Sequence, residues 1–229
     1  MELAKNAIDV GIYTNQREEQ LSFWQDQVGL PFEELLKVGG GSHQLRHGLK
    51  GSVFKMNHTR DPLSNDDPTG YSELIIAKEG LAEPVVLVDP DGNQVRLVPP
   101  GWHGIDQIGL VLKVSSIKSF QDFYRNILQI EEVTDRCFRW GTTLFFLEEA
   151  ASVQRCSGMR GGLGYRYITV QVWQVDKEHQ AFVDRGGDEA QAPMTLGSTA
   201  RISFITDPDG NWIEISQRAS LTGNLEIER

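Results

Sequence analysis

The 229-residue chain has few cysteines, an excess of acidic over basic residues and no long apolar run. Its two cysteines, Cys137 and Cys156, lack the paired spacing of a metal site and fit two reduced thiols in a cytoplasmic protein. The net charge of −10 argues against a nucleic-acid partner. Because no apolar stretch reaches about 18 residues, we expect no membrane span. The N-terminus also lacks the basic and apolar segments of a signal peptide.

One five-residue string, Asp-Pro-Asp-Gly-Asn, occurs twice, at 89–93 and at 207–211. Each copy lies between two apolar runs rich in Val, Ile and Leu. Glycine accepts a positive φ, proline presets a turn, and Asp and Asn side chains bond the local backbone, so each copy predicts a β-hairpin. Two identical hairpins indicate a duplicated unit.

The beginnings of the two units are also similar, since the sequence at 8–13 resembles that at 105–111. The first unit is shorter by about 20 residues, roughly one helix and one strand. This loss falls between Trp24 and Asp89. We therefore predict a shortened first domain at 5–100, a standard second domain at 103–218 and a tail at 219–229.

Apolar periodicity predicts βαβββ twice in the second half, and βαβββ followed by a trimmed unit in the first, because 78–83 is too short for a three-turn helix. The predicted class is α+β. Helices are expected at 15–28, capped by Thr14 or Asn15, after the cap Ser116, and at 176–185. Strands are expected at 7–14, 32–38, 43–47, 51–57, 74–77, 85–88, 94–98, 107–114, 131–134, 138–140, 143–147, 167–172, 194–196, 200–206 and 212–216.

This module order, with a closing Asp-Pro-Asp-Gly-Asn-x-x-Glu hairpin, resembles the vicinal oxygen chelate superfamily, which includes glyoxalase I, extradiol dioxygenases and bleomycin-binding proteins. The resemblance covers nearly the whole chain. It implies tandem βαβββ modules that form half-barrels of mixed sheet around pockets. It also implies a divalent metal such as Fe, Mn, Zn or Ni, held by the first strand of each module and the last strand of the second.

Carried over by position, the resemblance places candidate metal ligands at Gln107, Glu214 and Glu148. Tyr167 stands where the family usually has a histidine, and Phe145 is the alternative to Glu148. In the first half the corresponding residues are Asp9 and Arg96. An arginine at the carboxylate position rules out the usual metal cage there.

A second polar cluster lies in the first half, at 43–60. Alternation on strands predicts that Lys55 and Asn57 share one face, and that His43, Leu45 and His47 share one face. If the lysine face points inward, the cluster forms a donor-rich pocket for an anion. The predicted substrate-binding residues are Lys55, Asn57, Arg46, His58 and Arg96. We expect this cluster in one hollow and Glu214 in the other.

The leading hypothesis is a lyase or isomerase that acts on a small anionic or aromatic oxygenated molecule through an enolate. Its predicted catalytic residues are Glu214, Tyr167, Gln107 and His47. Two alternatives are a metal-dependent extradiol-type dioxygenase and a non-catalytic small-molecule binder resembling bleomycin-resistance proteins.

A purely structural role is open for each of these residues, because strand-face cations are usually solvated and buried polar groups often satisfy one another. The family's halves often pair edge to edge, which predicts a homodimer unless the duplication completes the pairing within one chain.

Overall fold

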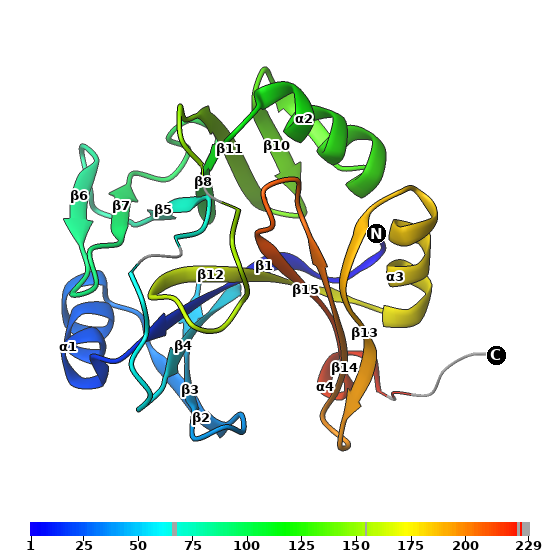
Figure 1. The fold of residues 1–229 in the computed structure, drawn as a ribbon. Helices are drawn as coiled ribbons and strands as arrows, with labels where there is room; N and C mark the ends of the chain where they lie inside the picture. The colour runs from blue at the N-terminus through cyan, green and yellow to red at the C-terminus, as the bar shows by residue number, and fades with distance from the viewer. Residues whose placement is uncertain (66–67, 154, 224, 226–229) are drawn as a thin grey trace.

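A computed structural model describes residues 1–65, 68–153, 155–223 and 225, which fold into two mixed β-sheets with helices at their edges (Figure 1). The eight-stranded sheet has the order β13-β14-β15-β12-β1-β4-β3-β2. Its strands are β1 (Leu3–Thr14), β2 (Phe32–Lys37), β3 (His43–Leu49), β4 (Ser52–His58), β12 (Gly164–Val172), β13 (Asp188–Leu196), β14 (Ala200–Thr206) and β15 (Trp212–Arg218).

The seven-stranded sheet has the order β6-β7-β5-β8-β11-β10-β9. Its strands are β5 (Tyr71–Ala77), β6 (Val85–Val88), β7 (Gln94–Val98), β8 (Ile108–Val114), β9 (Glu131–Thr134), β10 (Cys137–Trp140) and β11 (Thr143–Glu149). No helix among the described residues is long and apolar enough to span a membrane.

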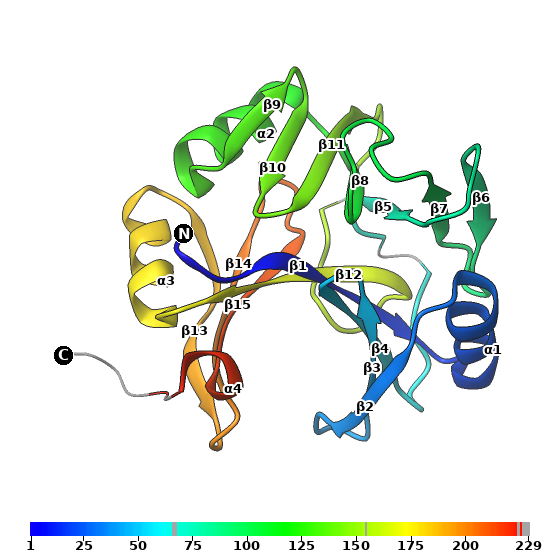
Figure 2. The same ribbon diagram turned by 180° about the vertical axis from the view of Figure 1, so that it is seen from behind.

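Each sheet combines strands from both halves of the sequence (Figure 2). The first module, β1 to β4, pairs with the last, β12 to β15, through antiparallel β1 and β12. The trimmed module, β5 to β7, pairs with the third, β8 to β11, through antiparallel β5 and β8. The predicted boundary near residue 100 therefore marks the duplication rather than two separate sheets. The edge-to-edge pairing is completed within one chain.

The two opening helices repeat one another closely. α1 (Arg17–Ser22) continues into a π-helical turn, η1 (Phe23–Val28), and α2 (Ile117–Asp122) continues into η2 (Phe123–Leu128). The cap at Ser116 is confirmed, since its hydroxyl accepts from the Ser119 N–H. The cap predicted at Thr14 or Asn15 is wrong, because the residue at the cap of α1 is Gln16 and no side chain caps the helix. The Asn15 side chain instead donates to the Thr59 and Asp61 carbonyls. The remaining helices are α3 (Val175–Asp184) and α4 (Ala219–Thr222).

Both predicted hairpin turns are confirmed. Asp207 Oδ1 accepts from the backbone N–H groups of Asp209 and Asn211, and Asp89 does the same at the first turn. Burial raises the pKa of Asp207 to about 7. Asp209 then accepts from the Ser115 N–H, so the second turn fixes the start of β15 beside the start of α2.

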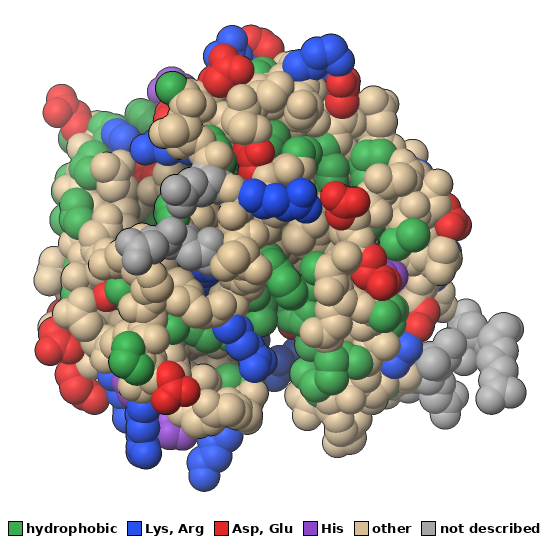
Figure 3. All heavy atoms as spheres, viewed as in Figure 1, with side chains coloured by type: hydrophobic (Ala, Val, Ile, Leu, Met, Phe, Trp, Pro, Cys, Tyr) green, Lys and Arg blue, Asp and Glu red, His purple; other side chains and the backbone are tan. Residues whose placement is uncertain are grey.

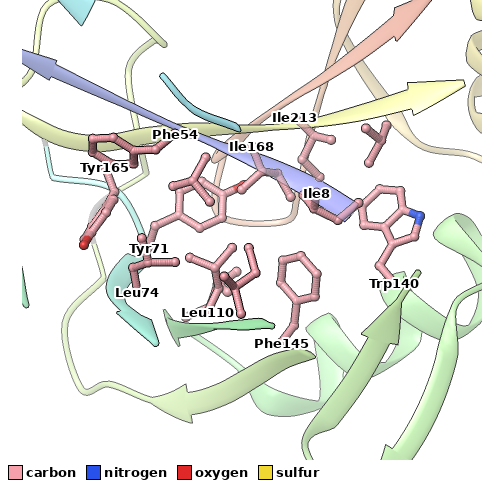
Figure 4. Packing of buried hydrophobic residues seen from close by; sticks show 14 of the residues in the cluster. Ile8, Phe54, Tyr71, Leu74, Leu110, Trp140, Phe145, Tyr165, Ile168 and Ile213 are labelled. Atoms are coloured by element: carbon pink, nitrogen blue, oxygen red, sulfur yellow. The ribbon is translucent and has the colours of Figure 1, made fainter. Parts of the chain in front are cut away.

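The core lies between the sheets, where one apolar face of each packs on the other (Figure 4). The eight-stranded sheet contributes Phe54 and Ile168, and the seven-stranded sheet contributes Leu110 and Phe145. Because side chains alternate along a strand, the neighbours of these core residues point to the outer face of each sheet. The two outer faces are therefore where any hollow must form.

The outer face of the seven-stranded sheet is largely filled with side chains. Ile105, from the segment that joins the halves, is 1% exposed and packs against Ile75 and Val111, with Trp102 beside it. These apolar side chains fill the outer face of the seven-stranded sheet and leave little room for a ligand. The outer face of the eight-stranded sheet is different, because most of its side chains are polar.

Candidate functional site

The outer face of the eight-stranded sheet carries a row of polar residues from four adjacent strands. Strand register sets Thr169 of β12 opposite both Asp9 of β1 and Glu214 of β15. Two residues further along β1, Gly11 lies opposite Lys55 of β4. Alternation then directs these side chains to one face, so the register alone brings them together.

Lys55 lies at the centre of this row. Its Nζ is 2.7 Å from Thr169 Oγ1, 3.0 Å from Glu214 Oε2 and 4.0 Å from Asp9 Oδ2. The Lys55, Glu214 and Asp9 side chains are only 5%, 13% and 1% exposed. In such a poorly hydrated place an ammonium group needs anionic partners, and two carboxylates supply them.

The Glu214 carboxylate is held by one of its two oxygens. Oε2 accepts from Lys55 Nζ and also from Thr169 Oγ1 at 2.6 Å. None of the described residues bonds the other oxygen, Oε1, which is therefore available to a ligand. Asp9 is more fully engaged, since it accepts from Lys5 Nζ, the Val53 N–H and Gln171 Nε2.

The Tyr167 phenol lies beside this cluster, with Lys55 Nζ 5.5 Å from its ring centre. Its oxygen accepts from Asn57 Nδ2 at 3.2 Å and Gln44 Nε2 at 3.3 Å. Burial, assisted by the negative charge of Glu214, raises the pKa of Tyr167 well above its usual value. The phenol therefore keeps its proton, which it can donate to a bound molecule.

Gly11 makes room for this tyrosine, because a Cβ at that position would overlap the Tyr167 ring. We expect Gly11→Ala to lower the free energy of unfolding by about 1–3 kcal/mol, since the Tyr167 ring is buried and would have to shift to make room. Urea unfolding measures this loss. Gly158→Ala is the matched control: its Cβ would meet only the Arg160 carbonyl oxygen at 3.7 Å, so a change within about 0.5 kcal/mol is expected. Equal costs for both variants would contradict the tight fit at Gly11.

The row opens into a cavity of about 860 Å³. The curled sheet brings β2 and β13 to opposite sides of its mouth, and Glu34 of β2 reaches across to Arg218 at the end of β15 at 3.3 Å. Figure 3 shows this mouth as a hollow between two lobes, with basic and hydrophobic side chains along it.

The walls of the cavity differ in character. Among the described residues, five lining side chains are cationic and only Glu214 is acidic. The cationic residues are Lys37, Arg46, Lys55, Arg160 and Arg218. The opposite wall, from β13 to β15 and the preceding loop, is mainly apolar and contains Met159, Met194, Leu196, Ile202, Phe204 and Trp212. In a chain of net charge −10, this cationic concentration favours an organic anion.

Five of the predicted site residues share this cavity: Glu214, Tyr167, Lys55, Asn57 and Arg46. The expectation that Glu214 and the lysine cluster occupy separate hollows is wrong, because Lys55 and Glu214 form an ion pair. The cause is the pairing of the first module with the last. The predicted sharing of one face by Lys55 and Asn57 is confirmed.

Three predicted residues lie on the seven-stranded sheet or directly beside it and do not reach the cavity. Gln107 directly precedes β8, and Glu148 is exposed on β11. Arg96 on β7 pairs with Glu73 at 2.9 Å instead of contributing to an anion pocket. The predicted metal ligands Gln107, Glu148 and Glu214 are therefore not brought together.

The two predicted histidines lie outside the cavity lining. His47 is fully buried between Phe32 and Phe54, and burial lowers its pKa. His58 is half-buried at the end of β4, where burial and nearby arginines lower its pKa. Arg46 and His47 are consecutive on a strand and must point to opposite faces, so only one of them can line the cavity.

Sequence reasoning did not select Thr169, Gln44, Tyr13 or Arg160, which complete the site. Thr169 lies two residues after Tyr167, and Gln44 two before Arg46, so strand alternation was the signal that would have found them. Arg160 hydrogen-bonds the Tyr13 hydroxyl, whose pKa is nevertheless raised by burial. Both side chains line the cavity.

The residues present do not fit the divalent metal that the resemblance implies. The described residues contain no group of three or more His, Cys, Asp or Glu side chains that could hold such an ion. Where the first and last strands of the paired modules converge, the donors are Asp9, Thr169 and Glu214, with an ammonium group among them. A positive charge held at that point opposes a second one.

Comparison with known proteins supports the fold. Residues 104–215 match the model of the Glyoxalase/Bleomycin resistance protein/Dioxygenase superfamily. Glyoxalase I from Zea mays is 14% identical, with 92% of each chain covered and a TM-score of 0.73. A Bacillus subtilis protein that is proposed to be a dioxygenase is 13% identical, with 100% of this chain and 92% of that chain covered and a TM-score of 0.66.

The cppA protein from Streptococcus pneumoniae is 10% identical, with 95% of this chain and 100% of that chain covered and a TM-score of 0.57. None of the curated proteins matches the chain in a sequence comparison. At such low identity these structural likenesses show a shared fold and no shared activity.

Proposed function

We propose that this chain, which has the vicinal oxygen chelate fold of the glyoxalase, bleomycin-resistance and dioxygenase superfamily, is an enzyme that removes a proton next to a carbonyl group. Its substrates are small carboxylates with an apolar body. The observation that carries the proposal is the meeting of Lys55, Glu214 and Tyr167 in one cavity. These side chains supply a base, a fixed cation and a hydroxyl donor at one place.

The substrate class follows from the two walls of the cavity. Arg46 and Arg218 share Glu34 as a partner, at 3.0 and 3.3 Å, and both line the cavity. One carboxylate against two guanidinium groups leaves positive charge for a substrate carboxylate. Phe204 and Trp212 on the other wall, with ring centres 5.3 Å apart, suit an aliphatic or aromatic body.

The proposed step uses the free oxygen of Glu214. Oε1 takes the proton, the C–H bond breaks, and its electron pair becomes the double bond of an enolate. The developing oxygen charge is stabilised by the Lys55 ammonium and the Tyr167 hydroxyl. Return of the proton to another position completes an isomerase reaction. Departure of a leaving group from the next carbon completes a lyase reaction.

Two other functions are less well supported by this site. Extradiol ring cleavage needs an iron or manganese cage, and the donor set described above does not form one. Binding of a cationic drug, as in bleomycin resistance, is disfavoured by the five cationic side chains in the cavity. A non-catalytic binder of organic anions is the remaining alternative, and the experiment below separates it from an enzyme.

The test is deuterium exchange at the carbon next to the carbonyl, followed by NMR in D₂O. A panel of 2-oxo carboxylates with methyl, isobutyl and benzyl side chains is incubated with the protein, with the methyl esters as matched neutral controls. We expect enzyme-dependent exchange in the carboxylates, and exchange slower by about tenfold or more in the esters, because they lack the charge recognised by Arg46. If the carboxylates raise the melting temperature of the protein but no exchange is seen, the protein is a binder and the proposed reaction is wrong.

A further inference from the structure

The contacts of Lys55 have the arrangement of a cation-binding site. Four strands, β1, β4, β12 and β15, each contribute one residue, and three of these residues present oxygen atoms to the Lys55 Nζ atom. The oxygen atoms of Thr169 and Glu214 are within hydrogen-bond distance, and the nearer Asp9 oxygen is at 4.0 Å. Oxygen donors of this kind also suit hard divalent cations such as Mg²⁺ and Mn²⁺.

We infer that the Lys55 ammonium takes the place of a divalent cation and that its removal exposes a latent metal-binding site. The charges support this. Asp9 and Glu214 carry two negative charges, and Lys5 and Lys55 balance them at 2.6 and 3.0 Å. A divalent ion added to this balanced set gains no net attraction and would have to lie against the Lys55 ammonium group. The same set with a carboxylate at position 55 has a net charge of −2, which a divalent ion neutralises.

Position 55 can deliver a ligand as well as remove a charge. Lys55 is on β4 with its Cα paired to Gly11, and its side chain already reaches Thr169 and Glu214. A shorter glutamate or glutamine side chain places its oxygen on the near side of the same space. Together with Asp9, Thr169 and Glu214, it gives four oxygen donors, a set that suits a hard divalent cation such as Mn²⁺ and also accepts Co²⁺.

The experiment measures uptake of Mn²⁺ and Co²⁺ by wild type, Lys55→Glu and Lys55→Gln. Each protein is treated with chelator, loaded, gel-filtered and analysed for metal, and Co²⁺ is also followed by its visible absorption. We expect less than about 0.1 equivalent in wild type and about one equivalent in Lys55→Glu, with an apparent affinity raised about 100-fold. Metal should raise the melting temperature of Lys55→Glu and leave that of the wild type unchanged, because the wild type lacks the binding site.

The control is the double variant Lys55→Glu with Glu214→Leu, which keeps the new carboxylate but loses both the charge and the oxygen donors of Glu214, and which should lose most of the uptake. Lys55→Gln has the same donor count with less charge, so it tests the site if Lys55→Glu does not fold. Wild-type protein that retains one equivalent in a Glu214-dependent manner would overturn the inference. Folded Lys55→Glu or Lys55→Gln that takes up no metal would also overturn it. Neither readout depends on the proposed reaction.

Discussion

Replacing Glu214 by glutamine is expected to lower the rate of proton exchange by about 10³-fold, within the 10²–10⁴ range of a general base. Glutamine has nearly the same shape and leaves an oxygen for Lys55 and Thr169, but its amide cannot take a proton from carbon. The measurement is the NMR exchange rate at saturating substrate, which reports the chemical step. Substrate affinity should not fall, because the change removes the only acidic side chain among the described lining residues.

Glu148→Gln is the matched control, since it makes the same chemical change at an exposed position on the other sheet. It should leave the exchange rate within about twofold, as expected for a substitution far from the site. Full exchange activity in Glu214→Gln would remove Glu214 as the base. A similar loss in Glu148→Gln would show that the two sheets are coupled in a way that the structure does not indicate.

Much of the fold could be predicted because its signals are local. The hairpin at 207–211 was visible from its turn residues, and the hydrogen bonds from Asp209 and Asn211 to Asp207 explain why that string recurs. The lack of a helix at 78–83 followed from length. Module pairing could not be predicted, since it depends on which apolar faces pack across the core, as Phe54 does against the other sheet.

The same limit applies to the site. Strand alternation correctly placed Lys55 with Asn57, but Lys55 and Glu214 are 159 residues apart and meet only because β1 pairs with β12. Carrying family positions over within each half led to Gln107, which directly precedes β8 of the other sheet. The histidines were selected for their chemistry, whereas the structure uses His47 as a buried neighbour of Phe54.

Replacing Lys55 by methionine is expected to destabilise the protein by about 3 kcal/mol, because it leaves two carboxylates without their shared cation in a buried place. Methionine keeps most of the apolar length of the lysine side chain, so packing changes little. Glu214 is 13% exposed and Asp9 1% exposed, and water can compensate neither of them fully. Urea unfolding monitored by circular dichroism gives the free energy of unfolding. An unchanged m-value shows that variant and wild type expose the same surface on unfolding, so their free energies can be compared.

The double variant Lys55→Met with Glu214→Gln decides whether this cost arises from the ion pair. Neutralising Glu214 along with Lys55 removes one of the two unpaired carboxylate charges. The double variant should therefore be more stable than the sum of the single effects predicts, by about 1–3 kcal/mol. Glu214→Gln alone should cost less than Lys55→Met, since Lys55 keeps Thr169 at 2.7 Å and Asp9 at 4.0 Å. Strictly additive losses would mean that Lys55 and Glu214 do not interact in solution. The mechanism and the latent metal site would then both lose their common basis, because each requires the ammonium group to lie against that carboxylate.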